Sequence, residues 1–157
     1  MYKRVLVPLD GSEPGESVLP FLTDIAGPLD MTIVLLRVLE PLAPTVIDAG
    51  RDTVDDLPAR RRDAVEYLAP LAIALRARGI ETTTTIRVGR AEDEILAAAR
   101  TEGADLIAMS THGRSGIGRL LFGSVAEQVL RHAEVPVFLM RHTRRRAGTP
   151  HTTEAKR

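Results

Sequence analysis

Two short apolar runs flank a glycine-rich segment and a helix-forming segment in DLIAMSTHGRSGIGRLLFGSVAEQVLRHAEVPVFLM, residues 105–140. The runs DLIAMS (105–110) and VPVFLM (135–140) have the length and apolar character of buried strands. Residues 124–132 between them have the spacing of an amphipathic helix. A strand, a helix and a second strand in this order indicate two parallel strands joined by a right-handed crossover.

The same alternation extends back to the N-terminus. Strands are predicted over Lys3–Leu9, Met31–Leu39 and Ile80–Val88, and helices over residues 13–26, about 59–78 and about 90–102. The run at 31–39 is continuously apolar, which is typical of a strand buried on both faces. The threonine-rich run at 80–88 is polar enough for a sheet edge. The order β-α-β-α-β-α-β-α-β predicts a single-domain α/β fold, a doubly wound parallel sheet between two helix layers.

We have two further expectations for the first two helices. Pro20 should bend the first and Pro70 should kink the second, because a proline ring displaces the carbonyl four residues earlier. The second helix should bury one apolar face, made of Val65, Leu68, Leu71, Ala72 and Leu75. Residues 40–58 contain three prolines and several acids and should form a long exposed connection.

The composition excludes several classes of protein. The chain has 157 residues, 44% of them hydrophobic, and no cysteine, which excludes a disulfide framework, a thiolate zinc site and a catalytic thiol. No apolar stretch approaches the roughly 20 residues that span a bilayer, and the N-terminal apolar run is too short for a secretory leader. We therefore expect a soluble, cytoplasmic protein.

The net charge of zero is the sum of an acidic segment and a basic segment. Residues 1–141 carry 16 basic and 20 acidic side chains, whereas residues 142–157 carry 5 basic and 1 acidic. An acidic body with 3% aromatic residues argues against a nucleic-acid-binding surface. Residues 142–157 are predicted to be a basic, disordered tail, in which Arg144, Arg145 and Arg146 are solvated rather than bound to nucleic acid.

The segment from Ser110 to Ser124 is the strongest candidate for ligand binding. In a doubly wound sheet, ligands bind beyond the carboxyl ends of the strands, and here glycines and hydroxyls precede a helix N-terminus, where N–H groups favour an anion. Known phosphate-binding motifs do not fit this segment. A Walker A motif requires a lysine after Gly123, where Ser124 stands, and a dinucleotide fingerprint requires a third glycine at position 121, where Leu121 stands. A nucleophile elbow has Ile117 in place of a glycine.

A ligand-free loop is the alternative interpretation of this segment. Ser124 and Glu127 have the spacing of a capping box, so that Ser124 would cap its own helix. The glycines can serve only to turn the chain. Spacing alone leaves phosphate binding and a ligand-free loop both open.

Asp10 follows the first predicted strand and is the only carboxylate expected near a strand's carboxyl end on that side. It can bond a ribose or an adenine, help hold a divalent cation beside phosphates, or simply shape the turn with Gly11. Met109 and Val38, predicted at the ends of adjacent strands, are core residues or apolar walls for an adenine ring. The histidines at 112, 132, 142 and 151 lack the spacing of metal ligands.

The segment from Met109 to Ser124 resembles the signature G-x2-G-x9-G-[ST] of the universal stress protein (UspA-like) family, with Ser110 in place of the first glycine. VLVPLDGS at 5–12, GRAEDEI at 89–95 and VAEQVLRHAEVPVFLMR at 125–141 also resemble that family. The resemblance covers residues 2–141, so the domain is expected to span residues 1–141.

The resemblance implies a fold and a ligand. The fold is an α/β/α sandwich like that of the adenine-nucleotide alpha hydrolases, with five parallel strands in the order 3-2-1-4-5. The ligand is ATP or another adenine nucleotide, with Mg or Mn at Asp10. The residues that would line the nucleotide are Pro8, Leu9, Asp10, Val38, Met109, Ser110, Gly113, Arg114, Gly123, Ser124 and Val125. Ser110 would crowd the ribose or add a hydrogen bond, and binding should persist because the phosphate half of the signature is complete.

The implied function is an ATP-binding stress-response regulator whose bound and empty states are read by protein partners. The alternatives are a nucleotide-free dimeric scaffold and a slow ATPase, although no general base or acid pair accompanies Asp10. Family members are usually dimers. The last strand, Val135 to Met140, would be an apolar edge in the order 3-2-1-4-5, so we expect it to pair with a second copy around a two-fold axis.

Overall fold

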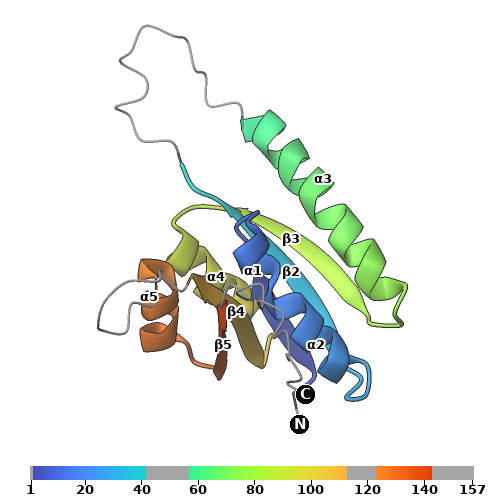
Figure 1. The fold of residues 1–157 in the computed structure, drawn as a ribbon. Helices are drawn as coiled ribbons and strands as arrows, with labels where there is room; N and C mark the ends of the chain where they lie inside the picture. Colours follow the sequence, from blue (N-terminus) through green and yellow to red (C-terminus); the bar gives the residue numbers. More distant parts are fainter. Residues whose placement is uncertain (1, 42–56, 113–122, 143–157) are drawn as a thin grey trace, which may run out of the picture.

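The computed structural model describes residues 2–41, 57–112 and 123–142. Within these ranges strands and helices alternate as predicted (Figure 1). In chain order the elements are β1 (Arg4–Pro8), α1 (Glu13–Glu16), α2 (Val18–Ala26), β2 (Thr32–Leu39), α3 (Leu57–Arg76), β3 (Thr82–Val88), α4 (Ala91–Thr101), β4 (Leu106–His112), α5 (Ser124–His132) and β5 (Val137–His142). The predicted strands and helices are therefore present, with ends shifted by at most two residues, except the first helix.

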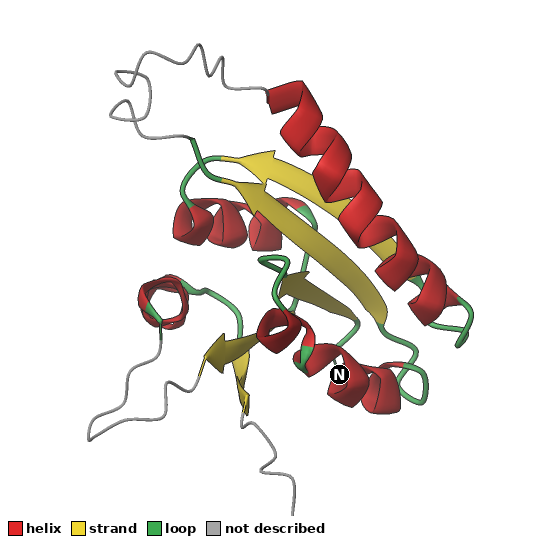
Figure 2. Ribbon diagram, turned by 45° about the horizontal axis from the view of Figure 1, so that its top comes forward, coloured by secondary structure: helices red, strands yellow, loops and turns green. Residues whose placement is uncertain are grey.

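The five strands form one parallel sheet in the order β3-β2-β1-β4-β5. This is the order that the resemblance implied, and the threonine-rich β3 lies at an edge as predicted. Helices cover both faces (Figure 2). α2 and α3 pack on one face in a core cluster with Val5 and Val7, while α4 and α5 pack on the other with Leu6. Successive side chains of the central strand β1 thus enter opposite cores, because side chains alternate along a strand.

The first helix differs from the prediction. Instead of one bent helix over 13–26, α1 and α2 are separated at Ser17. In a continuous helix, residue 20 would donate its N–H to the carbonyl of Glu16, and proline has no N–H to donate. The break makes Pro20 the third residue of α2, where the missing donor costs nothing because the first N–H groups of a helix lack intrahelical partners.

α3 is a continuous helix of 20 residues that passes through Pro70. Its buried side chains are Ala64, Leu68, Ala72 and Leu75. Val65 was predicted on this face but is 55% exposed, because it lies one position round the helix from Ala64. Of the predicted connection 40–58, residues 42–56 lie outside the described ranges. Neither α3 nor another helix of the described residues combines the length and hydropathy needed to cross a membrane.

Replacing Pro70 by alanine should stabilise the protein. Pro70 is exposed inside α3 and cannot donate to the carbonyl of Glu66. Alanine restores that bond with better helix propensity, and the more flexible unfolded chain offsets part of the gain, so Pro70→Ala should raise the free energy of unfolding by about 2 kcal/mol. The matched control is Pro20→Ala, which should change it by less than about 0.5 kcal/mol. Urea denaturation measures both, and equal effects would contradict the assignment of Pro20 to a first turn.

Candidate functional site

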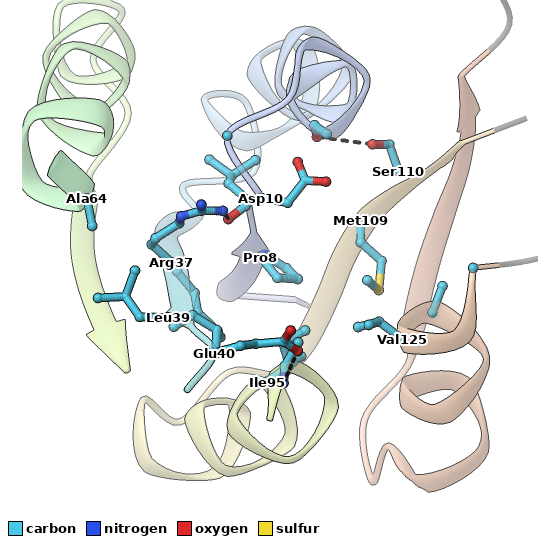
Figure 3. A pocket seen from close by; sticks show the side chains of 18 of the residues that line it. Pro8, Asp10, Arg37, Leu39, Glu40, Ala64, Ile95, Met109, Ser110 and Val125 are labelled. Atoms are coloured by element: carbon cyan, nitrogen blue, oxygen red, sulfur yellow. Dashed lines mark hydrogen bonds between the residues drawn. The ribbon is translucent and has the colours of Figure 1, made fainter. Parts of the chain in front are cut away.

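A cavity of about 790 Å³ opens at the carboxyl ends of β1, β2 and β4 (Figure 3). α1, α3, α4 and the start of α5 surround it. Nine of the eleven residues predicted for the site line it: Pro8, Leu9, Asp10, Val38, Met109, Ser110, Gly123, Ser124 and Val125. Gly113 and Arg114 lie outside the described residues. The size is that of a small-molecule site, commonly about 300–1,000 Å³.

The cavity exists because β1 stops before its neighbours. β1 ends at Pro8, paired with Leu36, while β2 continues to Leu39 and β4 to His112. Val38 and Met109 therefore do not lie on adjacent strands, as the sequence suggested, but flank the space that a longer β1 would fill. In a doubly wound sheet this central position, where the strand order reverses, is the expected place for a ligand.

The backbone of Val38 faces this space. The carbonyl of Leu36 accepts from Leu9 N at 2.8 Å on the β1 side, whereas the carbonyl of Leu39 accepts from Gly89 N at 3.1 Å on the β3 side. Because backbone groups alternate in direction along a strand, the N–H and C=O of Val38 point to the β1 side. No β1 residue is paired with Val38. One donor and one acceptor, adjacent in the chain, thus face the cavity.

Asp10 lies in the turn between β1 and α1. Its Oδ1 accepts from Ser12 N at 2.9 Å and from Ser12 Oγ at 2.6 Å, and Ser12 is the N-cap of α1. Gly11 allows the turn with a φ of +84°, a conformation that glycine adopts without strain. Asp10 therefore does shape the turn, one of the roles that the sequence left open, and it also lines the cavity.

Ser110 does not crowd the cavity, because its side chain is turned toward α1 (Figure 3). The hydroxyl donates to the carbonyl of Pro14 and lies 3.1 Å from that of Gly15. The hydrogen bond is made within the protein, so the effect of Ser110 on the ribose of a bound nucleotide stays a prediction.

Arg37 is a cavity residue that sequence analysis missed. It extends from β2, and its Nη1 donates to the carbonyl of Leu9 at 3.1 Å. Its guanidinium lies 5.9 Å from the centre of the Tyr67 ring, within the range of a cation–π contact. As the only charge in the apolar strand TIVLLRVL, it could have been identified as an exception needing a partner.

Tyr67 joins this wall of the cavity to α1. Its hydroxyl donates to Glu16 Oε1 at 2.9 Å. Burial, and then the hydrogen bond to Glu16, raise the pKa of the Tyr67 phenol above its ordinary value. The phenol therefore stays protonated as a donor at neutral pH.

Two further carboxylates, Glu40 and Asp63, line the cavity, and Glu40 at the end of β2 corrects the prediction that Asp10 would be alone at the strand ends. Glu40 directly follows β2, and its Oε1 accepts from Ala91 N, the first residue of α4, at 3.2 Å. The sequence did not identify it because its partner is 51 residues away. The neighbouring wall is apolar and consists of Ile95, Met109, Val125 and Ala126.

The start of α5 forms the far side of the cavity. Its N-cap is Gly123, not Ser124, and glycine has no side chain with which to cap the helix. Glu127 N donates to the carbonyl of Gly123 at 3.0 Å, so Ser124 is the first residue inside the helix and the capping-box alternative is wrong. Among the described residues, no side chain bonds the first N–H groups of this nine-residue helix, and such groups attract anions.

The described part of the chain contains no group of three or more histidine, cysteine, aspartate or glutamate residues that could hold a metal ion. The metal role of Asp10 stays a prediction.

Replacing Gly15 by alanine should disturb Asp10. A Cβ on Gly15 would lie 2.5 Å from Asp10 Oδ1 and 3.2 Å from Ser12 Oγ, so the carboxylate would have to move. We expect Gly15→Ala to lower the free energy of unfolding by about 1–3 kcal/mol. The matched control is Gly27→Ala, because no described atom lies within 4 Å of a Cβ there and the backbone is already helical. Thermal denaturation of both variants tests this, and equal stability would show that Asp10 is not held against Gly15.

Comparison with known proteins gives a consistent result. The profile of the universal stress protein family matches residues 1–141. Universal stress protein MJ0531 of Methanocaldococcus jannaschii is 27% identical over 143 residues, covering 90% of this chain and 83% of that protein. The structure of protein MJ0577 from the same organism has a TM-score of 0.72 at 26% identity, covering 91% of this chain and 98% of that one.

A further solved structure, of a universal stress protein in complex with cAMP, has a TM-score of 0.60 at 25% identity and covers 90% of this chain and 98% of that one. The sheet order, the position of the cavity and these matches agree, and the chain belongs to the universal stress protein family.

Proposed function

We propose that this protein binds an adenine nucleotide, ATP, in the cavity beyond β1, and that it acts as a stress-response regulator whose bound and empty states are read by partner proteins. The observation that carries the proposal is the backbone of Val38, whose N–H and C=O point into the gap left by β1.

These two groups complement adenine. The 6-amino group of adenine donates and its ring N1 accepts, so the base can bond the C=O and the N–H of one residue together. Guanine has the opposite pattern, with an acceptor at O6 and a donor at N1, and would leave both backbone groups unpaired. An unpaired buried polar group costs about 1–3 kcal/mol, so the site should prefer adenine. Ile95 and Met109 supply the apolar surface that a base needs.

The rest of the nucleotide has matching groups nearby. The Asp10 carboxylate accepts hydrogen bonds, and the hydroxyls of a ribose donate them. Phosphates would meet the uncapped start of α5 at Gly123, Ser124 and Val125, where N–H groups and the helix dipole favour negative charge. By resemblance, Gly113 and Arg114 would contribute from the preceding segment.

A divalent cation would arrive with the phosphates. Mg²⁺ is commonly held by one or two carboxylates together with phosphate oxygens and water. Asp10 would supply the carboxylate for Mg or Mn, and the cation would neutralise phosphate charge. The cAMP complex of the related universal stress protein supports an adenine nucleotide in this fold.

Isothermal titration calorimetry with ATP, GTP and adenosine tests the proposal. We expect ATP to bind and GTP to bind more than about tenfold more weakly, because of the two mismatched backbone groups. Gly123→Val places a side chain at the phosphate end of the cavity, so it should weaken the binding of ATP about tenfold and leave the binding of adenosine unchanged. The variant should fold normally, since no described atom lies within 4 Å of a Cβ at Gly123 and its φ is −54°.

The same experiment separates the alternatives. If the unmodified protein does not bind ATP, the nucleotide-free scaffold is the function that fits. Binding followed by phosphate release would indicate the slow ATPase. Equal affinity for ATP and GTP would remove Val38 from base recognition.

We also propose that the protein is a homodimer through β5. β5 lies at the edge of the sheet and pairs with β4 on one side only. Ile107 N donates to the carbonyl of Pro136 at 3.0 Å, so by alternation the N–H groups of Val137, Leu139 and Arg141 point to the open edge. An apolar edge of this kind favours pairing with a second copy.

Arg141→Pro should dissociate this dimer. It removes one N–H from the open edge, where proline is tolerated, and Arg141 is exposed, so the monomer should keep its fold. Phe138 is less suitable for substitution, because it stacks on Phe21 at 4.7 Å within the monomer. Arg141→Ala is the control, since it loses the same side chain but keeps the N–H. Light scattering should give a monomer for the proline variant and a dimer for the other; a monomeric unmodified protein would end the proposal.

A further inference from the structure

We propose that Ser110 is a positioning residue, which holds Asp10 in place for the ribose of the bound nucleotide through α1. The inference rests on the proposed function and gives Ser110, which lines the cavity, a role that it exerts through α1. It concerns the one position at which this chain departs from the glycine signature.

A continuous series of hydrogen bonds joins Ser110 to Asp10. The Ser110 hydroxyl bonds the carbonyls of Pro14 and Gly15. Gly15 N donates to Ser12 Oγ at 3.1 Å, and Ser12 Oγ in turn donates to Asp10 Oδ1 at 2.6 Å. Ser12 N donates to the same carboxylate oxygen at 2.9 Å. The series begins on β4, crosses α1 and ends at the carboxylate that lines the cavity.

α1 depends on such attachment because it is only four residues long. A helix this short is not stable alone, since forming its first turn costs more than one hydrogen bond returns. Its position must therefore come from contacts with the rest of the protein. Tyr67 attaches it to α3 through Glu16. Ser110 attaches it to β4, as Figure 3 shows.

The backbone of α1 is also in close contact with Asp10. A Cβ on Gly15 would lie only 2.5 Å from Asp10 Oδ1, so the helix cannot move toward the turn without displacing the carboxylate. It cannot move away without stretching the bonds of Ser12. Fixing α1 against β4 therefore fixes Asp10. A glycine at position 110 has no hydroxyl and cannot make this attachment.

The attachment differs from the local bonds of α1. Ser17 Oγ also donates to the carbonyl of Pro14, at 2.7 Å, but Ser17 lies between α1 and α2 and reaches no strand. Ser110 joins residues 96 positions apart in the chain. Ser17→Ala is therefore a matched control: it removes a hydroxyl from the same carbonyl and leaves the link to β4 intact.

The first test compares ATP with 2′,3′-dideoxy-ATP by calorimetry. If Asp10 binds the ribose hydroxyls and Ser110 positions Asp10, then Ser110→Ala should weaken the binding of ATP by about fivefold to tenfold. It should leave the affinity for the dideoxy nucleotide unchanged. Ser110→Thr keeps a hydroxyl and should restore ATP binding, and Ser17→Ala should not affect the ratio of the two affinities. An equal loss for both nucleotides, or no loss, would overturn the inference.

The second test does not require nucleotide. Amide hydrogen exchange, followed by NMR on the free protein, should be about fivefold to tenfold faster at Ser12 and Gly15 in Ser110→Ala. The amides of α4 should be unchanged and serve as the internal reference. If the unmodified protein binds no ATP, the proposed function fails; unchanged exchange at Ser12 and Gly15 overturns the positioning role in either case.

Discussion

The early end of β1 is the constraint on which the rest of the site depends. Leu9 N bonds β2, so alternation directs the backbone of residue 8 toward β4, and residue 8 is a proline without an N–H. The β1–β4 pairing ends at Leu6 and Ile107. The neighbouring strands continue past this point and leave a gap in the middle of the sheet. The cavity is that gap, and in consequence the backbone of Val38 has no partner on β1.

Polar groups then collect around the gap from segments distant in the chain. Asp10 comes from the turn after β1, Glu40 from the end of β2, Ser110 from β4 and the uncapped amides from α5. The three side chains each have a structural partner: Ser12 for Asp10, Ala91 for Glu40, and the carbonyls of α1 for Ser110. These hydrogen bonds keep the side chains in defined positions. In proteins, a preorganised site loses less entropy when it binds a ligand.

The two hydrophobic cores follow directly from the apolar strands. β1 and β2 are buried on both faces, and each contributes alternately to the two cores. Such strands are recognisable as continuous apolar runs, which is why the alternation of strands and helices could be predicted. The prediction failed where local chemistry mattered more than hydropathy. Pro20 was expected to bend a helix and instead accompanies a break at Ser17, and Val65 was placed on a buried face that Ala64 occupies.

Local pattern alone was sufficient for the strands, the helices, the class of fold and the candidate loop after β4, because those depend on neighbouring residues and on the period of apolar side chains. The order of the strands came from resemblance to a family, and so did Pro8, Leu9 and Val125 among the described candidate residues. Only the folded chain determined that Val38 and Met109 flank the space beyond the end of β1, that Arg37 and Glu40 line the cavity, and that the Ser110 hydroxyl bonds α1. These features join residues that are tens of positions apart, and hydrogen-bond direction across such separations is set by the packing of whole elements, which no local pattern encodes.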